Sequence, residues 1–326
     1  MGIFDKRVEM KPYEYPHLLD FKDAIRHSYW VHEEFMGELN SDVQDYHTNL
    51  THSEKELAKK AMLAIAQIEI SVKEFWGDIY KRMPKPEIGA VGYTFAESEV
   101  RHQDSYAALL ELLGLNSEFK KIPEIPAIQD RIDYLSEYIG GRKNGDDESY
   151  AMAVLLFSVF IEHVSLFSQF LIMMAFNRHK GVLKGISNVV EATSKEEQIH
   201  GEFGVAIIKI IKQENPEWFG EEFKEVVVKS CEKAYKAENK ILDWMYEEGD
   251  VDFIPKETVQ EYLKDRFNKA LKNIDLEPIF EVDDNIVSDT MWFEEEVLSS
   301  AHVDFFHKRP TSYSKNNKSF SEEDLF

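Results

Sequence analysis

Residues 150–176 read YAMAVLLFSVFIEHVSLFSQFLIMMAF, a long run of mostly apolar side chains. Its length meets the usual threshold for a helix that crosses a membrane. However, Glu162 and His163 lie at its centre, and ionisable groups in the middle of a bilayer are costly unless they face protein. A helix that is apolar on all sides is also typical of the core of a large helical bundle. We therefore predict a buried central helix rather than a membrane span.

Outside this run, apolar residues recur mainly three and four positions apart, which predicts an all-α protein. Ser53 and Glu56 have the spacing of a capping box, so we expect a helix that continues without a break to Trp76 and stops near Pro84. Residues 81–93 and 140–147 contain Pro or Gly and are expected to be connections. Further helices are predicted over residues 95–113, 147–178, 182–213, 219–246 and 256–272.

Composition excludes several classes of protein. The net charge of −23 would repel a phosphate backbone, which argues against nucleic-acid binding. The single cysteine, Cys231, cannot form an internal disulfide, and the first residues lack the apolar stretch of a secretory signal, so we expect a cytoplasmic protein. We predict one domain over residues 1–305 and a flexible tail over 306–326, because residues 309–326 are polar and poor in aliphatic side chains.

Two Glu-x-x-His pairs, Glu99/His102 and Glu197/His200, lie inside predicted helices. This spacing puts a carboxylate and an imidazole on one helical face, one turn apart. One such pair alone is more often a solvated helix face than a metal site. A third match, Glu14/His17, is interrupted by a proline, so no helix is expected to hold its spacing.

Two further predicted helices each carry a lone carboxylate in an apolar stretch, Glu69 in AMLAIAQIEISV and Glu162 in LLFSVFIEHVSL. A single buried Glu is more often a salt-bridge partner, but an unpaired buried carboxylate costs several kcal/mol and needs a compensating cation. One Glu from each of two helices and Glu-x-x-His from each of two others form the dimetal template of ferritin-like bundles. We therefore predict a ferritin-like bundle with two metal ions between four core helices. The predicted ligands are Glu69, Glu99, His102, Glu162, Glu197 and His200.

Three segments carry a resemblance to a known family: FAESEVRHQDSY (95–106), LLFSVFIEHVSLFSQF (155–170) and VVEATSKEEQIHGEFG (189–204). They resemble the small subunit of class I ribonucleotide reductase, and the resemblance covers nearly the whole chain. It implies a homodimer that generates a one-electron oxidant and passes it to a large catalytic subunit, which reduces ribonucleotides to deoxyribonucleotides. The chain itself would not bind the nucleotide.

The resemblance also implies roles for residues outside the ligand set. Tyr106 falls where the family commonly keeps its radical tyrosine, and Trp30 resembles the buried tryptophan on the radical-transfer route. Glu196 matches an acidic position that links this tryptophan to a metal-bound histidine. The polar tail resembles the segment that docks on the large subunit, with Tyr313 as the relay tyrosine. Each of these aromatic residues can also be read as an ordinary packing or tail residue.

Two departures from the family pattern bear on the metal. The first ligand is Glu69 and the acidic residue beside the histidine is Glu196, where the commonest tyrosyl-radical members have Asp. Glu69 resembles the subclasses that keep the oxidising equivalent on a manganese-containing pair. Lys73, one turn later, is placed to bind a ligand carboxylate or attract an anionic oxidant, although a solvated lysine fits the spacing equally well. We expect Mn/Mn, ahead of Mn/Fe and Fe/Fe, with Tyr106 not the stored radical.

Two other functions fit the ligand pattern. One is a ferritin-like oxidase that acts on its own substrate, and the other is a metal-storage or interaction protein without redox chemistry. Neither needs a tryptophan route or a docking tail, so Trp30, Glu196 and the tail favour the reductase.

Overall fold

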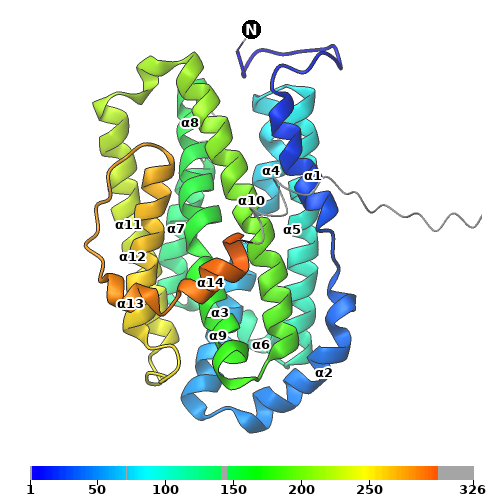
Figure 1. Ribbon diagram of the computed structural model, residues 1–326, viewed down its shortest axis with the longest axis vertical. Helices are drawn as coiled ribbons and strands as arrows, with labels where there is room; N and C mark the ends of the chain where they lie inside the picture. Colours follow the sequence, from blue (N-terminus) through cyan, green and yellow to red (C-terminus); the bar gives the residue numbers. More distant parts are fainter. Residues whose placement is uncertain (1, 71, 141–144, 300–326) are drawn as a thin grey trace, which may run out of the picture.

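The computed structural model describes residues 2–70, 72–140 and 145–299. The described residues form helices and loops and contain no strand, which confirms the all-α prediction. The long helices run roughly along one axis of an elongated bundle, and the short α14 crosses its face in Figure 1.

Nine helices build the body of the described bundle. They are α3 (His52–Ile68), α4 (Val72–Arg82), α5 (Pro86–Leu112), α7 (Pro126–Gly140), α8 (Asp147–Leu156), α9 (Phe167–Ala175), α10 (Lys184–Glu214), α11 (Glu221–Met245) and α12 (Lys256–Asn273). Shorter α-helices cover its sides and ends: α1 (Leu19–His27), α2 (Met36–Gln44), α6 (Asn116–Phe119), α13 (Asp284–Ser288) and α14 (Met291–Glu294). Single turns of 3₁₀-helix connect them at η1 (Pro16–Leu18), η2 (His32–Phe35), η4 (Ile122–Glu124) and η7 (Pro216–Phe219).

The apolar run forms a buried rod, as predicted. It spans Asp147–Lys180 and is long and apolar enough to cross a membrane, but 94% of its most apolar window is buried inside the protein. The rod is not regular along its whole length, because α8 passes into a π-helix, η5 (Phe157–Ser165), before α9 begins. A second π-turn, η6 (Phe176–Lys180), ends the rod, and two more occur at η3 (Asp45–Asn49) and η8 (Glu295–Ser299). Such π-segments are frequent at functional sites.

The helix expected from Ser53 to Trp76 starts earlier and is broken. Thr51, not Ser53, is the N-cap, and it forms the capping box with Glu54. Ser53 instead donates to the Glu248 carbonyl (2.7 Å). α3 ends at Ile68, where Glu69 and Ile70 form a turn, and α4 is a separate helix that begins at Val72.

The connection expected over residues 81–93 is mostly helix. Pro86 occupies the first turn of α5, where the missing N–H costs nothing, and only the residues just before it form a loop. Gly89 and Gly92 lie inside α5 because α4 packs closely against it. A Cβ atom on Gly92 would come within 2.6 Å of the Trp76 carbonyl oxygen. These glycines therefore set a close approach of two helices rather than a turn.

Candidate metal centre

Four segments of the core bring the six predicted ligands together. Glu69 follows the end of α3, α5 and α10 supply the two Glu-x-x-His pairs, and Glu162 comes from the π-helix η5. All six side chains are at most 1% exposed. They form two overlapping groups able to hold a metal ion, Glu69/Glu99/His102/Glu197 and Glu99/Glu162/Glu197/His200.

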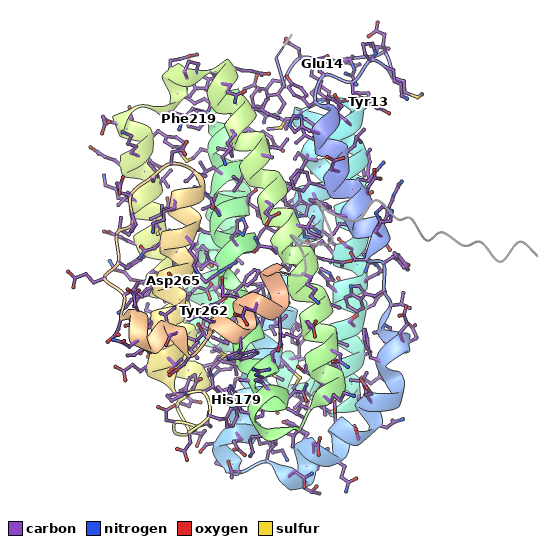
Figure 2. The ribbon with its side chains drawn as sticks, in the orientation of Figure 1. Tyr13, Glu14, His179, Phe219, Tyr262 and Asp265 are labelled. Atoms are coloured by element: carbon purple, nitrogen blue, oxygen red, sulfur yellow. The ribbon has the colours of Figure 1, made fainter. Side chains whose placement is uncertain are left out.

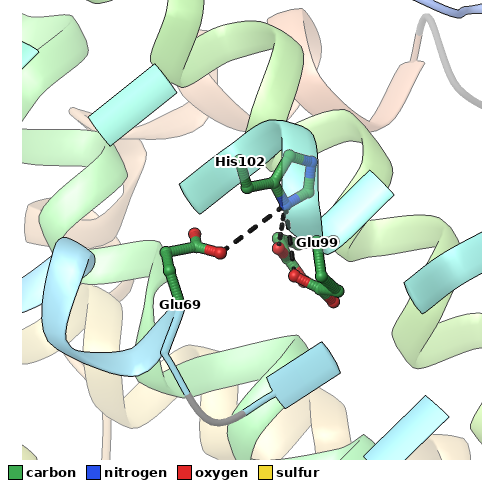
Figure 3. A group of neighbouring side chains, drawn as sticks. Glu69, Glu99 and His102 are labelled. Carbon is green, nitrogen blue, oxygen red and sulfur yellow. Dashed lines mark ion pairs between the residues drawn. The ribbon is translucent and has the colours of Figure 1, made fainter. Parts of the chain in front are cut away.

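Glu99 and Glu197 belong to both groups. Nδ1 of His102 lies 2.9 Å from Glu197, 3.3 Å from Glu99 and 3.8 Å from Glu69, and Figure 3 shows Glu69 and Glu99 pointing at this nitrogen. Nδ1 of His200 lies 3.0 Å from Glu99, 3.3 Å from Glu197 and 3.8 Å from Glu162. Each group thus has one imidazole and one terminal carboxylate, and two carboxylates are placed to bridge.

The distances between the donor atoms, and their lack of hydrogen-bond partners, are those expected of metal ligands. Octahedral ligands about 2.1 Å from an ion lie about 3 Å apart, close to the nitrogen–oxygen distances here. The inward-facing atoms of all six side chains are buried without a hydrogen-bond partner among the described residues, whereas most buried polar groups are paired. Oxygen and imidazole ligands without thiolate suit manganese or iron.

The pKa shifts of the predicted ligands show that the cluster favours bound positive charge. Burial, reinforced by the neighbouring carboxylates, raises the pKa of Glu69 and of Glu162 well above the usual range. Burial alone would lower the pKa of His102 and His200, but the surrounding carboxylates raise both. Burial would also raise the pKa of Glu197, yet the adjacent Glu162 carboxyl group and the two imidazoles hold that pKa well below its usual range. Metal ions that bind this cluster would therefore compete with protons for the same atoms.

A second layer of side chains orients the histidines. Glu196 lies 2.8 Å from Nε2 of His102, and Ser98 lies 3.0 Å from Nε2 of His200. Partners of this kind fix the tautomer, so that each Nδ1 faces the metal. Trp76 donates through Nε1 to Glu162 (2.9 Å). Sequence analysis missed Ser98 and Trp76, although Ser98 directly precedes a ligand.

The connection from Glu196 to Trp30 differs from the one expected. Arg101 donates to Glu196 (3.1 Å) and to the backbone carbonyl of Trp30 (3.1 Å). The indole N–H of Trp30 is buried without a partner among the described residues, and the indole ring stacks on His102 with centroids 6.0 Å apart. Trp30 therefore stacks on the predicted ligand His102, and Arg101, which sequence analysis overlooked, bridges Trp30 to Glu196.

Tyr106 and Lys73 both lie beside the site. Tyr106 is buried, and its burial, with the nearby charge of Glu69, raises the pKa of the phenol far above its usual range. Lys73 donates to the backbone carbonyls of Glu69 (3.2 Å) and Ile70 (3.0 Å) and to the side chain of Gln103. It binds backbone carbonyls in the turn that follows α3 and, within the described part of the chain, makes no hydrogen bond to a predicted ligand carboxylate.

The remaining candidates lie elsewhere. Glu14 pairs with Lys85 (2.8 Å) and lies at the upper end of the bundle, beside Tyr13 (Figure 2). This agrees with leaving the Glu14/His17 match out of the ligand set. Tyr313 and the predicted tail, residues 306–326, are outside the described residues.

Comparison with known proteins identifies the family. Residues 7–286 match the family model for the ribonucleotide reductase small chain. The chain belongs to this family. The probable ribonucleoside-diphosphate reductase small subunit of Invertebrate iridescent virus 3 is 25% identical over 324 residues, which cover 95% of this chain and 85% of the viral protein. The ribonucleoside-diphosphate reductase subunit beta of Chlamydia pneumoniae is 23% identical, over 72% of this chain and 69% of the bacterial one.

Solved structures show the same fold. The putative class I ribonucleotide reductase from Bacillus halodurans superposes with a TM-score of 0.77 at 18% identity, over 86% of this chain and 98% of that chain. The dimanganese(II)-NrdF of Streptococcus sanguinis gives a TM-score of 0.75 at 20% identity, over 88% of this chain and 99% of that one. The predicted ferritin-like architecture is therefore confirmed.

Proposed function

We propose that this chain is the radical-generating small subunit of a class I ribonucleoside-diphosphate reductase. The observation that carries the proposal is the continuous series from the two ligand groups through His102 to Glu196, Arg101 and Trp30. A protein that only stores metal ions does not need a buried tryptophan that stacks on a metal-binding histidine, as Trp30 does on His102. When bound, a pair of redox-active metals supplies a one-electron oxidant.

The residues of the chain would hold and protect that centre. Glu69 and His102 would bind one metal, Glu162 and His200 the other, and Glu99 and Glu197 would bind both. Burial of all six ligands excludes bulk water from the site. Glu196 holds the proton of the His102 imidazole at Nε2, so that Nδ1 stays free for the metal.

For the metals we propose Mn/Mn, ahead of Mn/Fe and Fe/Fe, with Tyr106 not oxidised in the stored state. Support comes from Glu69 in the first ligand position and from the resemblance in fold to the dimanganese protein. The six ligands offer only oxygen and imidazole nitrogen, which manganese and iron both accept. Lys73 has its ammonium tied to backbone carbonyls, so its role in activation would be indirect.

The proposed partners are a second copy of this chain and a large catalytic subunit, in the cytoplasm. A solved relative in the same fold is described as a homodimer, the Rnr4 protein of Saccharomyces cerevisiae. Residues 306–326 would dock on the large subunit, with Tyr313 passing the oxidising equivalent to it.

Two variants test this function. Trp30→Phe should abolish nucleotide reduction while the metal content and binding to the large subunit stay normal, because only the transfer step is lost. Deletion of residues 312–326 should also abolish reduction, but by weakening association with the large subunit. Both are measured as turnover and as affinity in the reconstituted complex. Normal turnover by either variant would contradict the corresponding assignment.

A further inference from the structure

A fully buried network of polar side chains lies beside the metal centre and contains none of its ligands. Its members come from α7, α9, α11 and η5, and they are Arg131, Tyr134, Glu238, Ser165 and Gln169. Arg131 and Glu238 form a two-pronged ion pair, with distances of 3.1 and 2.6 Å. Tyr134 adds hydrogen bonds to Glu238 (2.6 Å) and Ser165 (2.5 Å).

Arg131 uses its remaining donors on the backbone of the two segments that carry the terminal carboxylates. It donates to the Ala64 carbonyl (2.9 Å), in the last turn of α3 before Glu69. It also donates to the Ser165 carbonyl (3.3 Å), at the end of the π-helix that carries Glu162. One guanidinium thus ties the two ligand-bearing segments to each other.

The π-helix depends on side chains for several of its backbone bonds. Ser165 Oγ donates to the Phe160 carbonyl (2.9 Å), and the same Oγ is hydrogen-bonded to the Tyr134 hydroxyl. Arg266 of α12 donates to another carbonyl of the same segment, that of His163 (2.9 Å). Donors from α7 and α12 therefore both bind the backbone of the π-helix that carries Glu162.

A contribution to the free energy of unfolding does not explain why a buried ion pair is found at this place. Replacing a buried ion pair by apolar groups is often neutral or even favourable for the free energy of unfolding, so stability does not by itself account for this pair. We propose that Arg131 is a positioning residue that sets the separation of Glu69 and Glu162, and so the binding of both metals. This inference rests on the proposed metal centre.

The experiment compares Mn(II) binding by metal-free wild type and by Arg131→Met/Glu238→Gln, with unbound Mn(II) measured by electron paramagnetic resonance. Glutamine replaces Glu238 so that no unpaired carboxylate remains buried. Loss of a residue that orients metal ligands typically weakens binding about 10- to 100-fold. We expect a loss of this size at both sites together, because each site has one terminal carboxylate held by Arg131.

A matched control separates positioning from a general loss of stability. Arg7→Met/Glu87→Gln makes the same two replacements in another buried ion pair, which binds the N-terminal segment and no backbone group of α3 or η5. It should bind Mn(II) like wild type. If wild type itself fails to bind two Mn(II), the metal centre is wrong, whereas this inference fails if a folded Arg131 variant binds like wild type.

Arg131→Lys covers the case in which the double variant does not fold. Lysine keeps the charge beside Glu238 but cannot reach Ala64, Ser165 and Gln169 together with a forked set of donors. We expect a folded protein with a smaller loss of Mn(II) affinity than the double variant shows. Unchanged affinity at both sites in this variant would overturn the inference.

Discussion

Glu99 and Glu197 belong to both predicted metal sites, since each lies within 3.3 Å of the Nδ1 atoms of both imidazoles. We predict that Glu99→Ala and His200→Ala abolish stoichiometric binding of two metals while the chain stays helical. Metal analysis after dialysis and circular dichroism test this. Glu14→Ala/His17→Ala is the control and should bind two metals. Two tightly held metals in both ligand variants would contradict the dimetal assignment.

Removing the hydroxyl of Tyr106 tests whether this residue stores the radical. If the metals store the oxidising equivalent, Tyr106→Phe should still form the active centre and keep substantial activity, because it removes only a hydroxyl that has no hydrogen-bond partner among the described residues. Turnover and electron paramagnetic resonance of the active protein measure this, and wild type should show a manganese signal. An intense tyrosyl signal that disappears with all turnover in the variant would place the radical on Tyr106.

Sequence alone predicts which six side chains meet in the core, because residue type and spacing show their chemistry. Two Glu-x-x-His pairs and two lone carboxylates in apolar helices leave few other ways to satisfy buried charge. The second layer is harder to predict. It consists of residues such as Arg101, Ser98 and Trp76, each of which binds a side chain or carbonyl on another segment. A sequence shows which residues share a helical face, but not which segment packs against that face.

At the scale of elements, the close contact of α4 and α5 gives a direct test. Gly92→Ala places a methyl group within 2.6 Å of the Trp76 carbonyl, so the two helices must separate. Overpacking of this kind costs about 1–3 kcal/mol, and thermal unfolding should detect it. Gly37→Ala is the control, because no atom lies within 4 Å of the added carbon. Equal melting temperatures for Gly92→Ala and wild type would contradict this role.

The same scale shows what helical periodicity can and cannot predict. Residues 256–272 and 182–213 were predicted within about two residues of α12 and α10. Periodicity missed α1, α2 and α7. It also missed the end of α3 at Ile68, after which Lys73 donates hydrogen bonds to the carbonyls of Glu69 and Ile70. The π-helix around Glu162 was also missed, because donors distant in sequence, Arg131 and Arg266, satisfy its backbone.

At the scale of the whole molecule, metal binding should stabilise the fold, because the ligands join four segments of the core. A ligand at 100 times its dissociation constant adds about 2.7 kcal/mol per site. The raised pKa values of Glu69, Glu162, His102 and His200 mean that metals displace protons. Mn(II) should therefore raise the melting temperature more at about pH 8 than at about pH 6. A shift that is equal at both values, or equal in Glu99→Ala, would contradict this.

The buried rod from Asp147 to Lys180 also constrains how the chain is made. As the polypeptide leaves the ribosome, this segment emerges before α10 and α12, the helices that pack against its π-helical centre. Until residue 273 has been synthesised, a stretch as apolar as a membrane helix stays only partly covered. Nascent chains halted in that interval should aggregate or recruit chaperones, whereas chains halted beyond α12 should not. The segment that supplies Glu162 to the predicted metal centre is therefore prone to aggregation during translation, until the helices that cover it have been made.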